Sequence, residues 1–385
     1  MRASSFHSKR KSRAECWSTQ RDLFDHNVLS HDVADTPALS VMHVEKARCM
    51  MQAESKSRPT YGQQWHEYNL AQTNEKAKFQ ELLYELCHDV QEMPRKEGAP
   101  GRHRLPLGDM IFCVVTKTYE CCSGRRLASD LREAQRRGYI SRTPHFNSVF
   151  NYLELEEMTA CLHEMIRLSS LPLKSVEVDF AVDSSGFGTC QYKRWYDVKY
   201  GNTEDWREWL KLHLMCGVKT NIVTAVEVSH GTAGDSPYFA PLVNRTAQNG
   251  FNMREVSADK GYNAEKNYRL VLLHGAQPFI PFKDDAVQSP RKTLWNRLLR
   301  YFLWHEEEFF AHYHKRSNVE STFWMIKSKF GERLRSKTRI AQTNELLCKV
   351  LAHNLCCVIQ SMYELGLPVD FCASLHDAQN LDGLT

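Results

Sequence analysis

The sequence predicts an α/β fold in which helices flank a mixed sheet of five strands, with a helical region before it. Two observations lead to this prediction. Short apolar runs that alternate with polar residues, as strands do, begin only at Val176. Before that point apolar residues recur at helical spacing, and after it strand-like and helix-like stretches alternate. Of the 385 residues, 42% are hydrophobic and 25% are charged, which is ordinary for a globular protein.

The chain before Val176 divides into two parts. Residues 1–60 show no sustained periodicity, and we expect a flexible arm there. Residues 61–170 form a predicted helical region, with helices at 69–88, at 107–119, at 125–137 where Gly138 ends the helix, and after Thr143-Pro144. Basic residues outnumber acidic ones by about two to one over residues 95–142. This region fits a helix-turn-helix DNA-binding module and a helical dimerisation scaffold equally well.

Residues 171–365 form the predicted sheet domain, and residues 366–385 a C-terminal tail. Strands are expected at 176–183, 192–198, 210–228 with a turn near residue 220, 255–258 and 278–282. Helices are expected at 237–248, 264–274, 294–310 and from residue 313 onward. In the first strand Val176, Val178, Phe180 and Val182 share one face.

The stretch that begins at Tyr313 has the most informative pattern. In a helix Tyr313, Arg316, Glu320 and Lys327 fall within one arc of about 60°. An apolar stripe lies beside this arc and predicts that the helix packs on a core: Val319, Phe323, Ile326 and Phe330. A carboxylate between two cations and a phenol suits a site that handles a metal ion and a phosphate. The alternative is a surface helix with ordinary charge pairs.

Two further carboxylates each close an apolar strand-like run and precede a glycine turn. They are Asp183 in AVDSSGF and Asp259 in SADKGY. Asp179 lies on the same strand face four residues earlier and is the alternative to Asp183. Asp183 is preferred because it directly precedes the turn, where a metal can reach it. Asp235 in GDSP is expected to cap the following helix.

Taken together, these residues resemble the signature of DDE transposases from bacterial and archaeal insertion sequences. More narrowly, they resemble the group marked by Tyr-x2-Arg-x3-Glu-x6-Lys. The likeness continues through TNIVTAVEVSHGTAGDSPYF, NAEKN, PFIPFK and the NE…AHNL segment, and covers roughly residues 100–365. It implies an RNase H-like fold, which the predicted order of strands and helices matches.

The resemblance also implies a chemistry. The three carboxylates would be catalytic and would hold two Mg²⁺ or Mn²⁺ ions: Asp183, Asp259 and Glu320. DNA phosphates would be bound beside them by Tyr313, Arg316 and Lys327, while Lys260 contacts DNA or only solvent. The expected reaction is hydrolysis at the ends of a transposon, followed by strand transfer into target DNA. The expected partners are the terminal inverted repeats, the target DNA and a second copy of the chain in a homodimer.

Other interpretations of the sequence remain open. One is a catalytically inactive or domesticated DNA-binding protein derived from a transposase, and another is a metal-dependent nuclease that does not join DNA. The net charge of +4 supports a polyanionic partner only weakly. The 13 cysteines lack CxxC spacing, and no secretory signal or long apolar run is present. We therefore expect no membrane and a cytoplasmic, nucleoid-associated, prokaryotic location. Packing or hydrogen bonding is expected of His213, His230 and Trp195.

Overall fold

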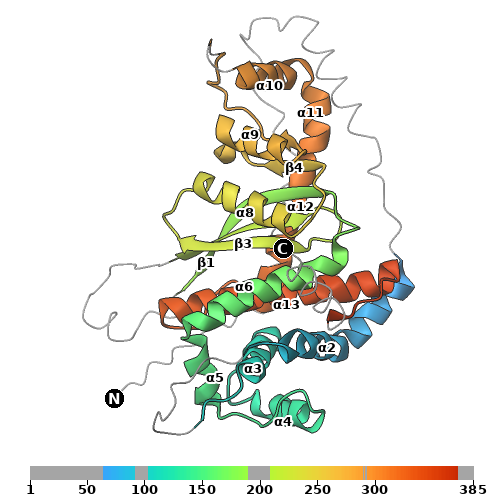
Figure 1. The fold of residues 1–385 in the computed structure, drawn as a ribbon, viewed down its shortest axis with the longest axis vertical. Coiled ribbons are helices and arrows are strands. Elements are labelled where there is room, and N and C mark those ends of the chain that lie inside the picture. The colour runs from blue at the N-terminus through green and yellow to red at the C-terminus, as the bar shows by residue number, and fades with distance from the viewer. Residues whose placement is uncertain (1–63, 92–102, 190–208, 289, 291–292, 372–385) are drawn as a thin grey trace, which may run out of the picture. The chain divides into compact units, whose positions relative to one another are not determined.

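The computed structural model describes residues 64–91, 103–189, 209–288, 290 and 293–371 (Figure 1). Three predictions fall outside these residues: the arm over residues 1–60, the strand over 192–198 with Trp195, and the tail beyond Phe371. From residue 63 onward the chain forms one compact unit. It contains the predicted helical region as well as the sheet.

The region before the sheet is helical, as predicted. Its elements are α2 (Trp65–His88), α3 (Leu107–Tyr119), α4 (Ala128–Arg136), α5 (Phe146–Leu153), α6 (Glu156–Ser170) and the short 3-10 helix η1 (Leu171–Leu173). The sequence reading named no helix at the position of α6. Gly138 follows α4 with φ of +82°, a conformation that glycine adopts without steric cost, so the predicted stop is confirmed.

The sheet has five strands in the order β3-β2-β1-β4-β5. They are β1 (Asp179–Gly188), β2 (Trp209–Gly217), β3 (Val223–His230), β4 (Glu255–Ala258) and β5 (Gln277–Phe279). The first three pair antiparallel, while β4 and β5 run parallel to β1. This confirms the predicted mixed sheet of five strands. The predicted run 210–228 supplies two of the strands, because the chain turns at Asn221, whose φ is +62°.

The helices after β3 are α8 (Ser236–Gln248), the 3-10 helix η2 (Lys260–Tyr262), α9 (Glu265–Leu273), α10 (Thr293–Trp304), α11 (Glu306–Tyr313), the 3-10 helix η3 (His314–Arg316), α12 (Ser317–Phe330) and α13 (Arg339–Leu365).

The prediction of one continuous helix from Tyr313 to Lys327 is wrong. α11 ends at Tyr313, η3 forms a tighter turn, and α12 begins at Ser317. The four signature residues therefore come from three elements.

Each face of the sheet packs against its own hydrophobic cluster. Phe180 and Val182 of β1 face the cluster formed with α8, α9 and α10. Ala181 faces the other, larger cluster, which includes α12, α13 and the helices before the sheet. The predicted two-residue alternation is confirmed for Phe180 and Val182. It does not hold for Val176, which lies before β1 and packs against the larger cluster. Side chains alternate between the two faces of a strand, so Asp183 shares the face of Ala181, which α12 covers.

Helix α13 joins the helical region to the sheet. It packs against α2, α3, α5 and α6, and Figure 1 shows α6 and α13 side by side. One hydrophobic cluster runs through these helices and β2, so the packing is continuous across residue 170. α13 is long and apolar enough to span a membrane, but 78% of its most apolar 18-residue window is buried inside the protein. That burial is typical of a core helix.

Candidate active site

Two carboxylates lie where the parallel pairing of β1 with β4 ends: Asp183 in the middle of β1, and Asp259 directly after β4. The prediction that the first strand closes at Asp183 before a glycine turn is wrong, because β1 continues to Gly188 and its second half pairs with β2. The register pairs Val182 of β1 with Ala258 of β4, and the next residue along each segment is an aspartate, Asp183 or Asp259. Paired strands lie about 4.8 Å apart, so these two aspartates are neighbours. Asp259 then caps η2, accepting a hydrogen bond from the Lys260 backbone N–H at 2.7 Å. Residues 76 positions apart in sequence are thus brought together by strand pairing alone.

Arg316 bridges Asp183 to the third predicted carboxylate. Its Nη2 donates to Asp183 Oδ2 at 2.7 Å, and its Nη1 donates to Glu320 Oε1 at 2.7 Å. The side chain of Asp183 is 18% exposed, whereas that of Glu320 is 59% exposed. The Arg316 Nε is buried and has no hydrogen-bond partner among the residues that the structure describes. The guanidinium therefore lies between the two carboxylates with one donor free.

The charge on Asp183 is not fully compensated. Burial raises the pKa of Asp183 above its usual value, and the nearby charge of Asp259 raises it further. The Ser184 backbone N–H and Arg316 act in the opposite direction without cancelling the rise. A buried carboxylate with a second carboxylate beside it favours binding of an additional cation.

The remaining predicted DNA-binding residues make different contacts around this centre. Lys327 donates to Ser185 Oγ at 2.8 Å and lies 5.1 Å from the centroid of the Phe187 ring, so it borders the second half of β1. Burial raises the pKa of Tyr313, and the charges of Arg316, Asp259 and Asp183 also shift it, which places the phenol within their reach. The Lys260 side chain is 54% exposed, and its Nζ is 3.8 Å from Asp284.

Asp235 belongs to the site, which the sequence reading missed. It occupies the position before α8, but its side chain makes no capping bond, so the predicted cap is wrong. Its Oδ1 instead accepts from Ser184 Oγ at 2.7 Å and from Lys211 Nζ at 3.0 Å. Burial opposes ionisation, yet these two donors lower the pKa of Asp235 below its usual value. Only the pairing of β1 with β2 brings Ser184 and Lys211 to this carboxylate, and no local sequence pattern signals that.

The two histidines considered from sequence have packing and hydrogen-bonding roles, as predicted. His213 is fully buried and stacks on Tyr238 at a centroid distance of 4.0 Å. Burial lowers the pKa of His213 to about 4, so the ring is neutral at pH 7, and its Nε2 bonds to Ser229 Oγ. His230 bonds to Thr232 Oγ1 at 2.9 Å.

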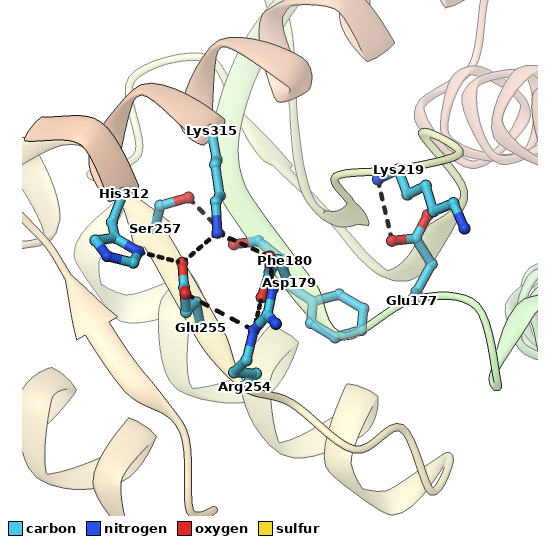
Figure 2. Close-up of polar contacts among 9 residues, drawn as sticks. All are labelled: Glu177, Asp179, Phe180, Lys219, Arg254, Glu255, Ser257, His312 and Lys315. Atoms are coloured by element: carbon cyan, nitrogen blue, oxygen red, sulfur yellow. Dashed lines mark hydrogen bonds and ion pairs between the residues drawn. The ribbon is translucent and has the colours of Figure 1, made fainter.

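Asp179, the alternative to Asp183, lies at the start of β1 and is already paired. Arg254 and Lys315 both donate to its carboxylate (Figure 2). These partners lower the pKa of Asp179, although burial alone would raise it. Asp183 instead lies in the middle of β1, where the pairing with β4 ends beside Asp259.

The described residues fit a divalent ion in part. Asp183 and Asp259 offer the hard oxygen ligands that Mg²⁺ and Mn²⁺ prefer, and the raised pKa of Asp183 reflects a need for positive charge. Among the described residues, however, no three histidine, cysteine or acidic side chains lie close enough together to hold a metal ion. The cause is local, because Arg316 binds the Glu320 carboxylate and occupies the space between it and Asp183.

The family comparison concerns the part of the chain that carries these residues. Residues 174–355 match the family model described as "Transposase DDE domain". This segment is thus similar to a transposase DDE domain, and we call it the DDE domain. The match confirms the resemblance and includes Asp183, Asp259 and Glu320. Within the DDE domain, two of the three carboxylates are adjacent and the third is joined to them by Arg316.

Three solved transposase structures are similar to the chain at low scores. The Drosophila P element transposase strand transfer complex matches 46% of this chain with 12% identity and a TM-score of 0.23, and the match spans 38% of the P element chain. A pre-cleavage Mos1 transpososome matches 75% of this chain and 94% of its own, with 11% identity and a TM-score of 0.21. The Mos1 transposase paired-end complex with the left transposon end matches 76% and 95%, with 11% identity and a TM-score of 0.20.

Proposed function

We propose that this protein is an active DNA transposase that cleaves DNA at the ends of an insertion sequence and joins them to target DNA. One observation carries the proposal. Within a segment that matches a transposase DDE domain, strand pairing sets Asp183 beside Asp259, and the segment from Tyr313 to Lys327 brings cations and a third carboxylate to the same part of β1. Phosphodiester chemistry requires carboxylates for metal ions and cations for phosphates in one place.

In this proposal Asp183, Asp259 and Glu320 would hold Mg²⁺ or Mn²⁺, with two ions as in two-metal phosphoryl transfer. When bound, such ions supply an activated nucleophile and neutralise charge on the leaving oxygen. Asp235, hydrogen-bonded to Ser184, would help to fix the backbone beside Asp183. Its role would be to position the middle of β1, where Asp183 lies.

The cations of the site would bind the DNA backbone. Arg316 presents a planar fork, and its buried Nε lacks a partner among the described residues, so a donor remains for a phosphate oxygen. Lys327, held beside Ser185, would supply a compact charge further along the DNA. Tyr313, near both aspartates, would donate its phenolic proton to a phosphate. Lys260 is exposed enough to contact DNA from the turn after Asp259.

We infer the partners and location from the same reaction. The substrates would be the terminal inverted repeats and the target duplex, and joining two ends at once requires two active sites, as in a homodimer. The chain would act in the prokaryotic cytoplasm at the nucleoid. The helices over residues 61–170 would contribute DNA binding or dimerisation contacts, and the division into arm, helical region, DDE domain and tail stays a proposal.

The decisive experiment is cleavage of a supercoiled plasmid that carries the ends of the element, with Mg²⁺ or with EDTA. Wild type would be compared with Asp183→Ala and with a matched control, Asp284→Ala, whose side chain is 97% exposed. We expect metal-dependent cleavage in wild type and the control only, and joined products on sequencing. Specific DNA binding without cleavage would instead favour a DNA-binding relic. Cleavage without joining would favour a nuclease.

A further inference from the structure

A second charged cluster lies at the opposite end of the parallel pairing between β1 and β4. Asp179 begins β1 and Glu255 begins β4, and the register makes them direct neighbours. Lys315 Nζ donates to Asp179 Oδ2 at 2.9 Å and to Glu255 Oε2 at 2.7 Å. Arg254 donates to both oxygens of Asp179, at 2.8 and 2.5 Å. Figure 2 shows Lys315 reaching down from its helical segment to the two carboxylates.

The two carboxylates of the cluster are shielded from water, although the Arg254 side chain is 61% exposed. The side chains of Asp179 and Glu255 are only 12% and 11% exposed, and that of Lys315 is 29% exposed. His312 adds a further contact, with its Nδ1 3.0 Å from Glu255 Oε2 and its ring stacked on Phe279. Ion pairs in such surroundings are screened less than surface pairs, and removal of one partner leaves a buried charge uncompensated. Breaking one of these ion pairs is therefore costly, which favours a fixed position for Lys315.

Lys315 is adjacent in sequence to Arg316. The two residues belong to the three-residue turn η3 but bind different points of the same strand: Lys315 binds Asp179, and Arg316 binds Asp183. Four strand residues separate these points by about 13 Å. Two long side chains from one short turn thus bind β1 at both ends of this interval. The turn can neither rotate nor shift along the strand without breaking one of the two contacts.

We propose that Lys315 is a positioning residue for the active site: its pairing with Asp179 and Glu255 anchors η3, and this anchor sets Arg316 and Glu320 beside Asp183. Lys315 touches no reacting group. The inference that Lys315 affects catalysis rests on the proposed function. The inference that Lys315 anchors η3 does not. The competing explanation is that the cluster only stabilises the sheet. Arg254 offers a matched comparison, because it pairs with the same Asp179 but is not attached to η3.

The first test follows η3 directly and needs no activity. Hydrogen exchange of the segment 313–320 would be measured by mass spectrometry in wild type, Lys315→Met, Lys315→Arg and Arg254→Met. We expect exchange at least tenfold faster in Lys315→Met, near wild-type protection in Lys315→Arg, and protection of this segment retained in Arg254→Met. Unchanged protection in Lys315→Met would overturn the proposal, as would an equal loss in Arg254→Met. If Lys315→Met does not fold, Glu255→Gln, which weakens one contact of Lys315, takes its place under the same criteria.

The second test asks whether Lys315 acts through Arg316. Cleavage rates of Lys315→Met, Arg316→Ala and the double variant would be compared with wild type. We expect each single change to slow cleavage at least tenfold, and the double variant to be no slower than Arg316→Ala. Independent, multiplying effects would refute action through Arg316. A wild type that does not cleave DNA would contradict the proposed function, while the exchange result would still decide the role of Lys315.

Discussion

At the residue scale, Arg316 is the centre of the site. It contacts Asp183 and Glu320 with separate nitrogens, and its own position depends on a turn of three residues. One guanidinium therefore compensates two carboxylates, while Asp259 has only the Lys260 backbone N–H and no cation within bonding distance among the described residues. An arrangement that leaves carboxylates short of positive charge is unfavourable for stability but suits a site that binds cations.

Glu320→Gln should abolish cleavage while DNA binding survives. The substitution removes a carboxylate that would bind metal but leaves the cations of the site in place. Because the Glu320 side chain is 59% exposed, we expect the free energy of unfolding to change by less than about 1 kcal/mol. Plasmid cleavage, fluorescence anisotropy with labelled ends and thermal melting would measure the three quantities. Normal cleavage would show that the assignment of Glu320 is wrong.

Asp183→Asn should stabilise the protein at pH 7. The pKa of Asp183 is raised in the folded state, so between the usual and the raised value the folded chain keeps a proton that the unfolded chain has lost. Stability therefore falls as pH rises through this window and stays lower at pH 7. Asparagine carries no such charge, and we expect a gain of about 1 kcal/mol.

Thermal melting of wild type and Asp183→Asn from pH 3 to pH 8 tests this sign. The advantage of the asparagine variant should shrink toward the acid end, where the wild-type carboxyl is protonated in both states. Asp284→Asn, at a side chain that is 97% exposed, serves as the control. A variant less stable than wild type at pH 7 would mean that the bond from Arg316 outweighs the cost of burial.

At the element scale, α13 holds the DDE domain and the helical region together through polar side chains as well as apolar packing. Asn354 is fully buried, and its Nδ2 donates to Val223 O at 2.8 Å and to Ser169 Oγ at 3.0 Å. Its Oδ1 accepts from Val223 N at 2.9 Å. Asn344, also buried, donates to Leu153 O and Leu155 O. The NE…AHNL segment is thus explained by contacts that join α13 to β3, α5 and α6.

Asn354→Ala should destabilise the fold by about 2–4 kcal/mol, because it leaves the buried N–H and C=O of Val223 without partners, and each such group costs about 1–3 kcal/mol. Urea unfolding would measure the change. Gln360→Ala, at a half-buried position on the same helix, should change stability far less. Equal effects of the two substitutions would contradict the role assigned to Asn354.

The elements also show where sequence reading succeeds. Helix α3 has the predicted bounds, 107–119, since its apolar spacing and its breaks are local. The break between α11 and α12 was not predicted, because the sequence from Tyr313 to Lys327 has a regular helical pattern and no proline or glycine. The anchoring of Lys315 on Asp179 and Glu255, together with the bond from Arg316 to Asp183, accompanies the 3-10 turn. These are tertiary contacts that periodicity does not encode.

At the scale of the whole molecule, residues from 63 onward form one compact unit with a hydrophobic cluster that runs from α2 to β2. Leu83 of α2 is fully buried in that cluster, and Phe371, beyond α13, is buried there too, with its N–H donating to Glu85 at 3.1 Å. We therefore expect the helical region and the DDE domain to unfold together.

Leu83→Ala tests this cooperativity. It should lower the free energy of unfolding by about 2–5 kcal/mol, the range for a buried leucine that leaves a cavity. Hydrogen exchange in urea would follow α2 and β1 separately, and both should lose protection at the same, lower urea concentration. Leu70→Ala, at a residue 40% exposed, is the control. Loss of protection in α2 alone would show that the two regions unfold independently.

The sequence by itself determined the fold class and predicted the carboxylates of the candidate site. Alternating apolar residues specify the face of β1, and the motifs around Asp183, Asp259 and Glu320 specify the family, since both are local in sequence. Tertiary structure decided how those residues meet. Strand pairing placed Asp183 beside Asp259, two anchored side chains set η3 so that Arg316 joins Glu320 to Asp183, and pairing of β1 with β2 brought Asp235 into the site. Each of these depends on contacts between residues far apart in the chain, which no spacing rule contains.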